Sequence, residues 1–404
     1  MELRDVERKL TAILSADCQL VISKMPVILR RSALWVSLTC TLFWVLAAAD
    51  IASAQTFSSE RHEFHLATIA RGLSHPWSLA FLPNGDMLVT ERIGRLRIVR
   101  NGELDPTPIS GVPEVGLGGQ AGLLDIALHP QFAENRLIYL SYTAAGEGGN
   151  GTVVARARFA EDRLADLETL LEVSPRAPWG RHFGSRFLFG RDGYLYITVG
   201  EHGSSDRAQD LSDLAGSIMR ITDDGGVPPD NPFVDRPGAR PEIYTYGNRN
   251  PQGLAMHPET GQIWEAEHGP KGGDEINLLT PGTNYGWPVI THGRSYAGLQ
   301  IGEGTEKPGM AQPLRFWTPS ISPSGMAFYT GDDFPSWRGN LFLGALTGRA
   351  LVRLELDGTT VVHEERLLLD YGQRIRDVRQ GPDGRLYLLM DASNGALLRL
   401  DPAP

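Results

Sequence analysis

The stretch that decides the fold is residues 187–199, FLFGRDGYLYITV, in which two apolar runs flank a short turn that ends at Gly193. Apolar strands joined by a tight glycine turn predict a β-hairpin. This pattern of strand, turn and strand occurs six times along the chain, at residues 77–89, 123–140, 187–197, 253–264, 325–343 and 377–389. Six similar hairpins in one chain indicate a repeat architecture.

The hairpins favour an all-β fold, a six-bladed β-propeller with four-stranded antiparallel blades, running from near Glu63 to Leu400. Successive turns lie 44 to 79 residues apart. A four-stranded blade needs about 40–50 residues, so we assign the surplus to loops. A pair of β-sandwiches is the alternative, but it does not explain six similar hairpins. In a propeller, the loops before the first strand of each blade meet at one mouth of the central channel, where we expect the chemistry.

The composition is that of an acidic globular protein. Hydrophobic residues make up 41% of the 404 residues. Residues 55–404 contain 32 basic and 43 acidic side chains, a net charge of −11, and they show no basic stripe. Because such a chain repels a phosphate backbone, we expect no nucleic-acid binding. Both cysteines, Cys18 and Cys40, precede residue 55, which excludes disulfides, thiolate nucleophiles and iron–sulfur clusters from the rest of the chain.

The N-terminal region has the layout of a secretion signal. Arg30 and Arg31 precede an apolar run over residues 33–49, and small residues follow immediately before Gln55. A basic segment, an apolar segment and a small-residue exit are typical of a signal peptide. An uncleaved membrane anchor is the alternative, although the run is at the short limit for a bilayer span.

These features divide the chain into three parts. Residues 1–24 are interpreted as a mis-assigned start or a fusion scar, residues 25–54 as the signal peptide, and residues 55–404 as one catalytic propeller domain. We therefore expect a periplasmic or secreted protein with no stable membrane insertion after the signal is cleaved.

Four side chains in the loops before the repeated strands could carry chemistry. A neutral imidazole at His182 could take a hydroxyl proton near pH 7, or it could be a structural histidine. The forked donors of Arg249 could hold an anion or form an ion pair between blades. Arg374 and Arg376 share one strand face, which suits a polyanionic ligand or a solvated edge.

A glycine-rich loop with flanking carboxylates, residues 267–275, reads EHGPKGGDE. Backbone carbonyls together with acidic side chains are the oxygen ligands that calcium prefers. The loop lacks the alternating acids of an EF-hand, and a simple tight turn is the alternative.

Together these segments resemble the soluble quinoprotein glucose/sorbosone dehydrogenase family, and most closely its aldose sugar dehydrogenase branch, which depends on pyrroloquinoline quinone (PQQ). The resemblance covers roughly residues 66–402. It rests on five motifs in order, namely GGQAGLLDIALHPQF (118–132), HFGSR (182–186), YGNRNPQGLA (246–255), EHGPKGGDEINLLTPGTNYGWP (267–288) and RIRDVRQGPDGRLY (374–387).

The resemblance implies a six-bladed propeller with PQQ and Ca²⁺ at the channel mouth. His182 matches the general base of the family, and Arg249 matches the arginine beside the reactive quinone carbonyl. The remaining matches are Gln120, Asn250, Arg374 and Arg376 at cofactor-contacting positions, the carbonyls of Gly269 and Pro270 at the cofactor-side calcium, and Glu275 with the Tyr285 carbonyl at a second calcium.

The implied reaction is oxidation of an aldose sugar at its anomeric carbon to a lactone. His182 would take the hydroxyl proton while hydride moves to the quinone, and Arg249 and calcium would stabilise the negative charge that grows there. A body without cysteine cannot attach c-type haem. Electrons would therefore leave to an external acceptor such as a quinone, a cytochrome or a dye.

Three positions depart from the glucose dehydrogenase branch of the family. Arg181 stands where that branch has an acid, Asn248 where a histidine is common, and Thr347 where a lysine contacts the cofactor. These departures weaken glucose specificity more than dehydrogenase activity. The alternative functions are a calcium-dependent propeller hydrolase or lactonase and a non-catalytic carbohydrate-binding propeller.

Overall fold

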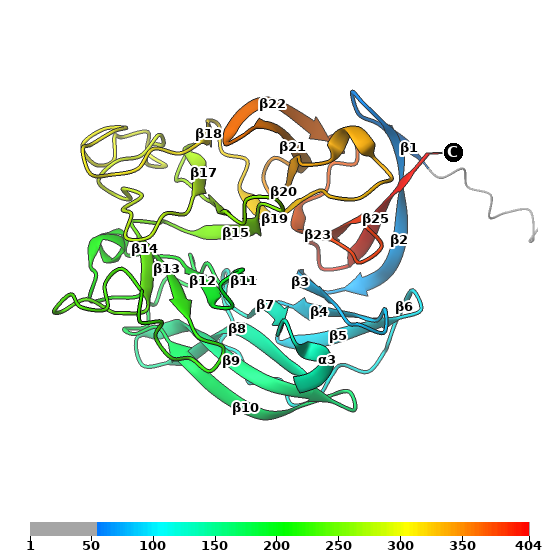
Figure 1. The fold of residues 1–404 in the computed structure, drawn as a ribbon, viewed down its shortest axis with the longest axis horizontal. Helices are drawn as coiled ribbons and strands as arrows, with labels where there is room; N and C mark the ends of the chain where they lie inside the picture. The colour runs from blue at the N-terminus through cyan, green and yellow to red at the C-terminus, as the bar shows by residue number, and fades with distance from the viewer. Residues whose placement is uncertain (1–54, 404) are drawn as a thin grey trace, which may run out of the picture. The chain divides into compact units, whose positions relative to one another are not determined.

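The structure, a computed structural model, describes residues 55–403, which form six antiparallel sheets around a common axis (Figure 1). The first three sheets, from the axis outwards, are β3 (Pro76–Phe81), β4 (Met87–Glu91), β5 (Arg95–Arg100) and β6 (Glu103–Leu104); β7 (Leu123–Leu128), β8 (Leu137–Gly146), β9 (Gly149–Ala160) and β10 (Arg163–Glu172); and β11 (Phe187–Phe189), β12 (Leu195–Val199), β13 (Ser217–Ile221) and β14 (Ile243–Tyr246).

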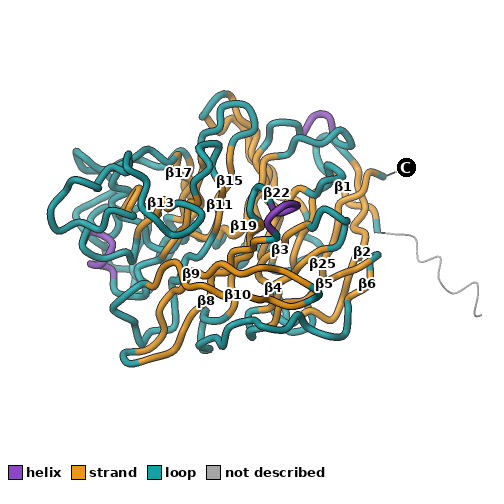
Figure 2. Tube along the Cα trace, turned by 60° about the horizontal axis from the view of Figure 1, so that its bottom comes forward, coloured by secondary structure: helices purple, strands orange, loops and turns teal. Residues whose placement is uncertain are grey.

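The next two sheets have the same order. They are β15 (Pro251–Met256), β16 (Ile263–Glu267), β17 (Asp274–Leu278) and β18 (Arg315–Trp317), followed by β19 (Pro323–Phe328), β20 (Leu341–Ala345), β21 (Ala350–Asp357) and β22 (Thr360–Leu367). Helical segments in the described residues are short (Figure 2), namely α3 (Phe132–Asn135) and the 3₁₀ turns Ser205–Gln209 and Pro335–Trp337. The expected all-β, six-bladed propeller is confirmed.

The last blade joins the two ends of the described chain. Its inner strands are β23 (Ile375–Gln380), β24 (Leu386–Met390) and β25 (Gly395–Pro402), and β2 (Glu63–Leu73) pairs with β25 from the outside, followed by the short β1 (Thr56–Ser58). Figure 1 shows blue β2 beside red β25. This pairing closes the ring, because each innermost strand contacts the innermost strands of both neighbouring blades.

Each predicted hairpin forms the two innermost strands of one blade. In the third blade, Phe187 pairs with Ile197 and Phe189 with Leu195, and Gly193 adopts a φ of 81° in the turn. Glycine accepts this left-handed backbone without the steric penalty of a side chain. These turns lie at one end of the strands, so the loops before the first strands gather at the opposite end.

Apolar side chains fill each gap between neighbouring blades. For example, Leu88 and Ile98 of the first blade pack with Ile126 and Leu140 of the second. Corresponding clusters join every other pair of adjacent blades, including the last blade with the first. The core is therefore a ring of interfaces, and the axis itself is left to polar groups.

A buried ion cluster occupies the axis beneath the mouth. The guanidinium of Arg186 lies 3.0 Å from Asp377 and 3.5 Å from Asp125, and Arg379 bonds to both carboxylates. Arg186 also stacks under the Trp77 ring, with its guanidinium carbon 4.0 Å from the ring centroid. Because buried charges need partners, this cluster ties several blades together and forms the floor of the mouth.

The assignments of residues 1–24 and 25–54 lie outside the described residues. Among the residues that the structure describes, no helix is long and apolar enough to cross a membrane.

A candidate cofactor site at the channel mouth

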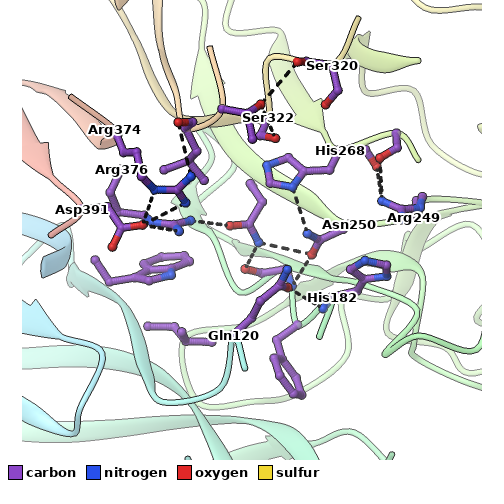
Figure 3. Close-up of a pocket in the computed structure, with 18 of the residues that line it drawn as sticks. Gln120, His182, Arg249, Asn250, His268, Ser320, Ser322, Arg374, Arg376 and Asp391 are labelled. Carbon is purple, nitrogen blue, oxygen red and sulfur yellow. Dashed lines mark hydrogen bonds and ion pairs between the residues drawn. The ribbon is translucent and has the colours of Figure 1, made fainter. Parts of the chain in front are cut away.

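A cavity of about 460 Å³ lies at the end of the axis where the innermost strands begin. It is lined by eight residues that the sequence analysis selected, namely Gln120, His182, Arg249, Asn250, Gly269, Pro270, Arg374 and Arg376. Figure 3 shows Arg374 and Arg376 on one side of the cavity and His182 and Asn250 on the other. Side chains up to 256 positions apart in the sequence thus share one chamber.

His182 is held by hydrogen bonds on two sides. Its Nδ1 lies 2.8 Å from a carboxylate oxygen of Glu201, and its backbone N–H donates to Oε1 of Gln120 at 2.7 Å. A carboxylate only accepts, so Nδ1 carries the proton and Nε2 keeps a free lone pair. Within residues 55–403, Nε2 has no hydrogen-bond partner. Burial lowers the pKa of His182 below its usual value of 6.5, which keeps the ring neutral at pH 7.

Arg249 presents its guanidinium to the cavity wall. One nitrogen donates to the carbonyls of His268 at 3.1 Å and Gly269 at 2.7 Å, and the group lies over the Trp287 ring. Its Nε is buried and has no partner among the described residues. A buried donor without a partner is unfavourable, so Arg249 has capacity for a further acceptor.

Arg374 and Arg376 share one carboxylate, that of Asp391. Both guanidinium groups lie 3.2 Å from the same Asp391 oxygen, and Nδ1 of His75 lies 3.0 Å from the other. Despite burial, the charges of Arg376 and Arg374 hold the pKa of Asp391 well below its usual range. Two cations facing one anion leave a net positive charge, which suits an anionic ligand. The alternative of a solvated edge is wrong for Arg376, which is mostly buried.

A network of amides connects the two sides of the cavity. Gln252 accepts from Arg376 at 3.1 Å and donates to the Gly184 carbonyl at 3.0 Å. The Asn250 oxygen accepts from the Gly184 N–H at 3.1 Å. His268 is held by the Pro323 carbonyl, and burial lowers its pKa to about 3, so this imidazole is neutral. The walls are therefore prepositioned by hydrogen bonds rather than free to turn.

The two carbonyls expected at the cofactor-side metal lie at the cavity wall. Gly269 and Pro270 line the cavity, and the Gly269 carbonyl accepts from Arg249 at 2.7 Å. Two neutral carbonyls do not complete a calcium shell of six to eight oxygens. In the described part of the chain no group of three or more histidine, cysteine or acidic side chains is placed to hold a metal. A calcium ion here would need oxygens from a bound ligand.

A second, smaller cavity adjoins the first beneath Arg249. Glu275, Glu267 and Tyr285 line it. Burial and the neighbouring charge of Glu267 raise the pKa of Glu275 well above its usual value. Glu265, also buried nearby, has one oxygen without a partner in residues 55–403. Only two of these carboxylates, Glu267 and Glu275, line the small cavity, so a metal ion there would need further oxygen ligands, such as the backbone carbonyl of Tyr285.

Several cavity residues were missed by the sequence analysis. Glu201, which holds His182 from outside the cavity lining, had no role assigned. The lining residues that were not selected are His75, Trp77, Arg92, Leu124, Phe183, Gly184, Gln252, His268, Tyr296, Ser320, Ser322, Leu346, Thr347 and Asp391. Thr347 was left out because it departs from the lysine of the related branch, yet it lines the cavity. Glu201 and His268 each belong to a Glu-His-Gly triplet, at residues 201–203 and 267–269. This repeated triplet was the sequence feature that could have marked both residues as part of the site.

Residues 73–399 match the family described as glucose/sorbosone dehydrogenase. The chain belongs to the glucose/sorbosone dehydrogenase family. This match covers most of the chain and includes all ten residues selected for the site.

Named members of the glucose/sorbosone dehydrogenase family are similar over most of their length. The aldose sugar dehydrogenase YliI of Escherichia coli is 48% identical over 336 residues, which cover 82% of this chain and 91% of that protein. The crystal structure of the soluble aldose sugar dehydrogenase of E. coli in its apo form has a TM-score of 0.82 at 46% identity, covering 84% and 100% of the two chains. The PQQ-bound form of aldose sugar dehydrogenase from Streptomyces coelicolor has a TM-score of 0.69 at 31% identity, covering 84% and 98%.

Proposed function

We propose that this protein oxidises aldose sugars at the anomeric carbon to lactones, using PQQ and Ca²⁺ and passing electrons to an external acceptor. The observation that carries the proposal is the cavity itself. A neutral, carboxylate-held His182 lies in the same chamber as Arg249, Arg374 and Arg376. The kinship with aldose sugar dehydrogenases, one of them in a PQQ-bound form, supports it.

The residues present fit PQQ, a planar tricarboxylate quinone. Arg374 and Arg376 offer guanidinium groups that one aspartate does not neutralise, and Arg249 has a buried Nε without a partner. Arginine forks bind carboxylates with two parallel hydrogen bonds. We assign Arg374, Arg376, Gln120 and Asn250 to holding the cofactor. When bound, PQQ would supply the two-electron acceptor that the side chains themselves lack.

His182 is assigned the proton-abstracting role. Its free Nε2 would take the proton of the anomeric hydroxyl, while Glu201 keeps the other proton on Nδ1 and stabilises the imidazolium as it forms. The backbone of His182 has a left-handed φ of 60°, and its N–H is fixed by Gln120. Position and tautomer are thus set before the substrate arrives.

Arg249 is assigned the electrostatic role. Its guanidinium is anchored on the carbonyls of His268 and Gly269 and on the Trp287 ring, so it cannot swing away. A prepositioned cation stabilises negative charge that develops nearby without reorganising. The carbonyls of Gly269 and Pro270 would hold a calcium ion on this side, with Glu275 and the Tyr285 carbonyl holding a second one behind it.

The test is reconstitution of the purified chain from Gln55 onward. After chelator treatment, Ca²⁺ and PQQ would be added separately and together, and dye reduction followed with several aldoses, a disaccharide and simple alcohols. We expect turnover with aldoses only when both additions are present. A quinone spectrum without turnover would contradict the catalytic assignment, and neither spectrum nor turnover would favour a hydrolytic or carbohydrate-binding propeller.

The pH dependence of turnover should report the pKa of His182. Burial lowers its pKa, so kcat/KM should be constant near pH 7 and fall in acid with a midpoint below 6.5. The Glu201 hydrogen bond raises that pKa, so Glu201→Gln should move the midpoint further into acid. The measurement is kcat/KM against pH for both proteins. A midpoint that rises in Glu201→Gln would contradict the assignment.

Calcium should stabilise the protein through Glu275. Without PQQ, Ca²⁺ at a hundredfold excess over its Kd should raise Tm by about 2 °C or more. Glu275→Gln should abolish that rise without lowering the metal-free Tm, because the change removes one of three crowded carboxyl groups. Thermal unfolding with and without Ca²⁺ measures both effects. Glu259→Gln, on an exposed turn, is the matched control.

We also propose a periplasmic or secreted location, on the strength of the signal-like residues 25–54. N-terminal sequencing of the protein recovered from the cell envelope would test it. A mature chain starting near Gln55 is expected, and a chain that retains the apolar segment would favour the anchored alternative.

A further inference from the structure

Exposed apolar side chains gather around the cavity mouth. In residues 55–403, ten large hydrophobic side chains are exposed. Five of these lie within three positions of a cavity-lining residue, namely Ile93, Leu117, Trp179, Tyr296 and Leu299. They come from loops of the first four blades, and the fifth and sixth blades contribute none, so they cover only part of the edge of the opening. Trp179 and Tyr296 are 59% and 75% exposed, and such exposure at a functional opening indicates a binding surface.

The exposed charges around the same opening have a single sign. Within two positions of a cavity-lining residue, every exposed charged side chain of the described chain is basic, namely Arg181, Lys271, Arg294 and Arg349. None of the four forms an ion pair within residues 55–403. Residues 55–404 have a net charge of −11, so this basic rim opposes the charge of the rest of the molecule.

Two of the rim cations face one another directly. Lys271 and Arg294 pair across a short antiparallel bridge, with backbone hydrogen bonds of 2.9 and 3.2 Å in the two directions. Like charges directly opposite on paired strands are destabilising. Lys271 follows Pro270, and Arg294 begins the short hairpin that carries Tyr296. The bridge therefore holds two cations at the edge of the cavity, where an anionic partner would relieve their repulsion.

We infer that this rim is the docking surface of an acidic electron-carrier protein. The rim consists of the apolar side chains Ile93, Leu117, Trp179, Tyr296 and Leu299 and the basic side chains Arg181, Lys271, Arg294 and Arg349. The inference rests on the proposed function, which requires electrons to leave through the mouth. Electron-transfer encounters between proteins are weak and bury little surface, and the opposite charge of the partner would steer it to the mouth. Arg249, Arg374 and Arg376 line the cavity, where they would hold the cofactor, whereas the four rim cations are exposed to solvent.

The number of electrons released per turnover defines how many partner molecules are needed. Oxidation of one aldose to its lactone releases two electrons and two protons. Two one-electron carrier proteins would each accept one electron in successive encounters, and the protons would pass to water. A surface visited twice per turnover must release its partner quickly, which favours electrostatic attraction over a large apolar contact.

The experiment uses the reconstituted enzyme reduced by excess sugar without oxygen, mixed with an acidic or a basic single-haem cytochrome c. The probe variant is Lys271→Glu with Arg294→Glu. The matched control is Arg163→Glu with Arg236→Glu, two exposed arginines at the opposite ends of the strands. The second-order rate of haem reduction is followed at low salt and at about 0.5 M salt, where charges are screened.

We expect the wild type to reduce the acidic cytochrome at least about tenfold faster at low salt than at high salt. The probe variant should lose about tenfold or more of that low-salt rate and should gain rate with the basic cytochrome. The control variant should behave as the wild type. Leu117→Ser with Leu299→Ser should slow both cytochromes while keeping the salt dependence, and Val234→Ser with Val362→Ser is its control.

Other outcomes would overturn the inference. An unchanged rate in the probe variant would place the partner elsewhere. A raised KM for sugar with unchanged cytochrome rates would make the rim part of the sugar site, and slower PQQ association alone would make it a guide for the cofactor. Binding of the acidic cytochrome to cofactor-free protein, measured by calorimetry at low salt, tests docking even if no sugar reduces the enzyme, so failure of the proposed function is distinguishable.

Discussion

His182→Asn is expected to lower kcat for aldose oxidation by about 10²–10⁴-fold, the usual contribution of a positioned general base. Asparagine suits this position because His182 has a φ of 60°, and asparagine accepts left-handed backbone better than alanine does. The backbone N–H would still donate to Gln120. The affinity for PQQ should change little, since the cofactor is assigned to the arginines. Pre-steady-state reduction of the bound quinone measures the step directly.

His202→Asn is the matched control for this prediction. His202 is also buried, also left-handed at a φ of 56°, and burial lowers its pKa to about 3, but it does not line the cavity. Its ring bonds to Thr152 and packs against Phe183, and its backbone N–H donates to the His182 carbonyl, a bond that asparagine keeps. The control should keep kcat within about twofold of the wild type. If His182→Asn kept full turnover, or if both variants lost activity equally, the base would have to be sought elsewhere in the cavity.

Arg249→Met is expected to lower kcat by about 10²–10³-fold, the loss typical of removing one prepositioned donor to a developing negative charge. Arg249→Lys should recover only part of the loss, because an ammonium cannot bond the two loop carbonyls and also reach into the cavity with a planar fork. The measurement is kcat per cofactor-loaded site, with PQQ content determined from its absorption.

Arg353→Met is the control for loss of a buried arginine. Arg353 is fully buried in the fifth blade and bonds to Glu365 and Asn340, and none of these three residues lines the cavity. It should lower Tm, because breaking a buried ion pair leaves a carboxylate without its partner, and should leave kcat per loaded site unchanged. An equal fall in kcat for both arginine variants would show that instability, not electrostatics, causes the effect.

The fold could be predicted because its signal is local. Each hairpin, such as residues 187–199, contains its own two apolar runs and its own glycine turn. Six similar hairpins in one chain indicate a closed repeat fold, the β-propeller. The cavity-lining candidates were also predictable, because a propeller places the loops before its first strands at one mouth. His182, Arg249 and Arg376 could therefore be selected from their positions before or at the start of these strands, without any contact between them being known.

Partnerships within the site were not predictable in the same way. Asp391 lies in the turn after β24, and nothing in its local sequence indicates that Arg374, Arg376 and His75 meet on it. Gln252 lies in β15, yet it bonds to a strand 124 positions later. Such pairs depend on how two blades are rotated against each other, and that rotation is set by packing of the apolar clusters between them.

The sequence by itself therefore determined the number of blades, the end of the strands at which the site lies and the chemical character of its side chains, because local periodicity and residue type are properties of short segments. Only the tertiary structure decided that Glu201 sets the tautomer of His182, that one aspartate is shared by two arginines, and that the outer rim is basic and apolar. These features arise when ring closure brings loops from different blades together, and burial then fixes which charges must face one another.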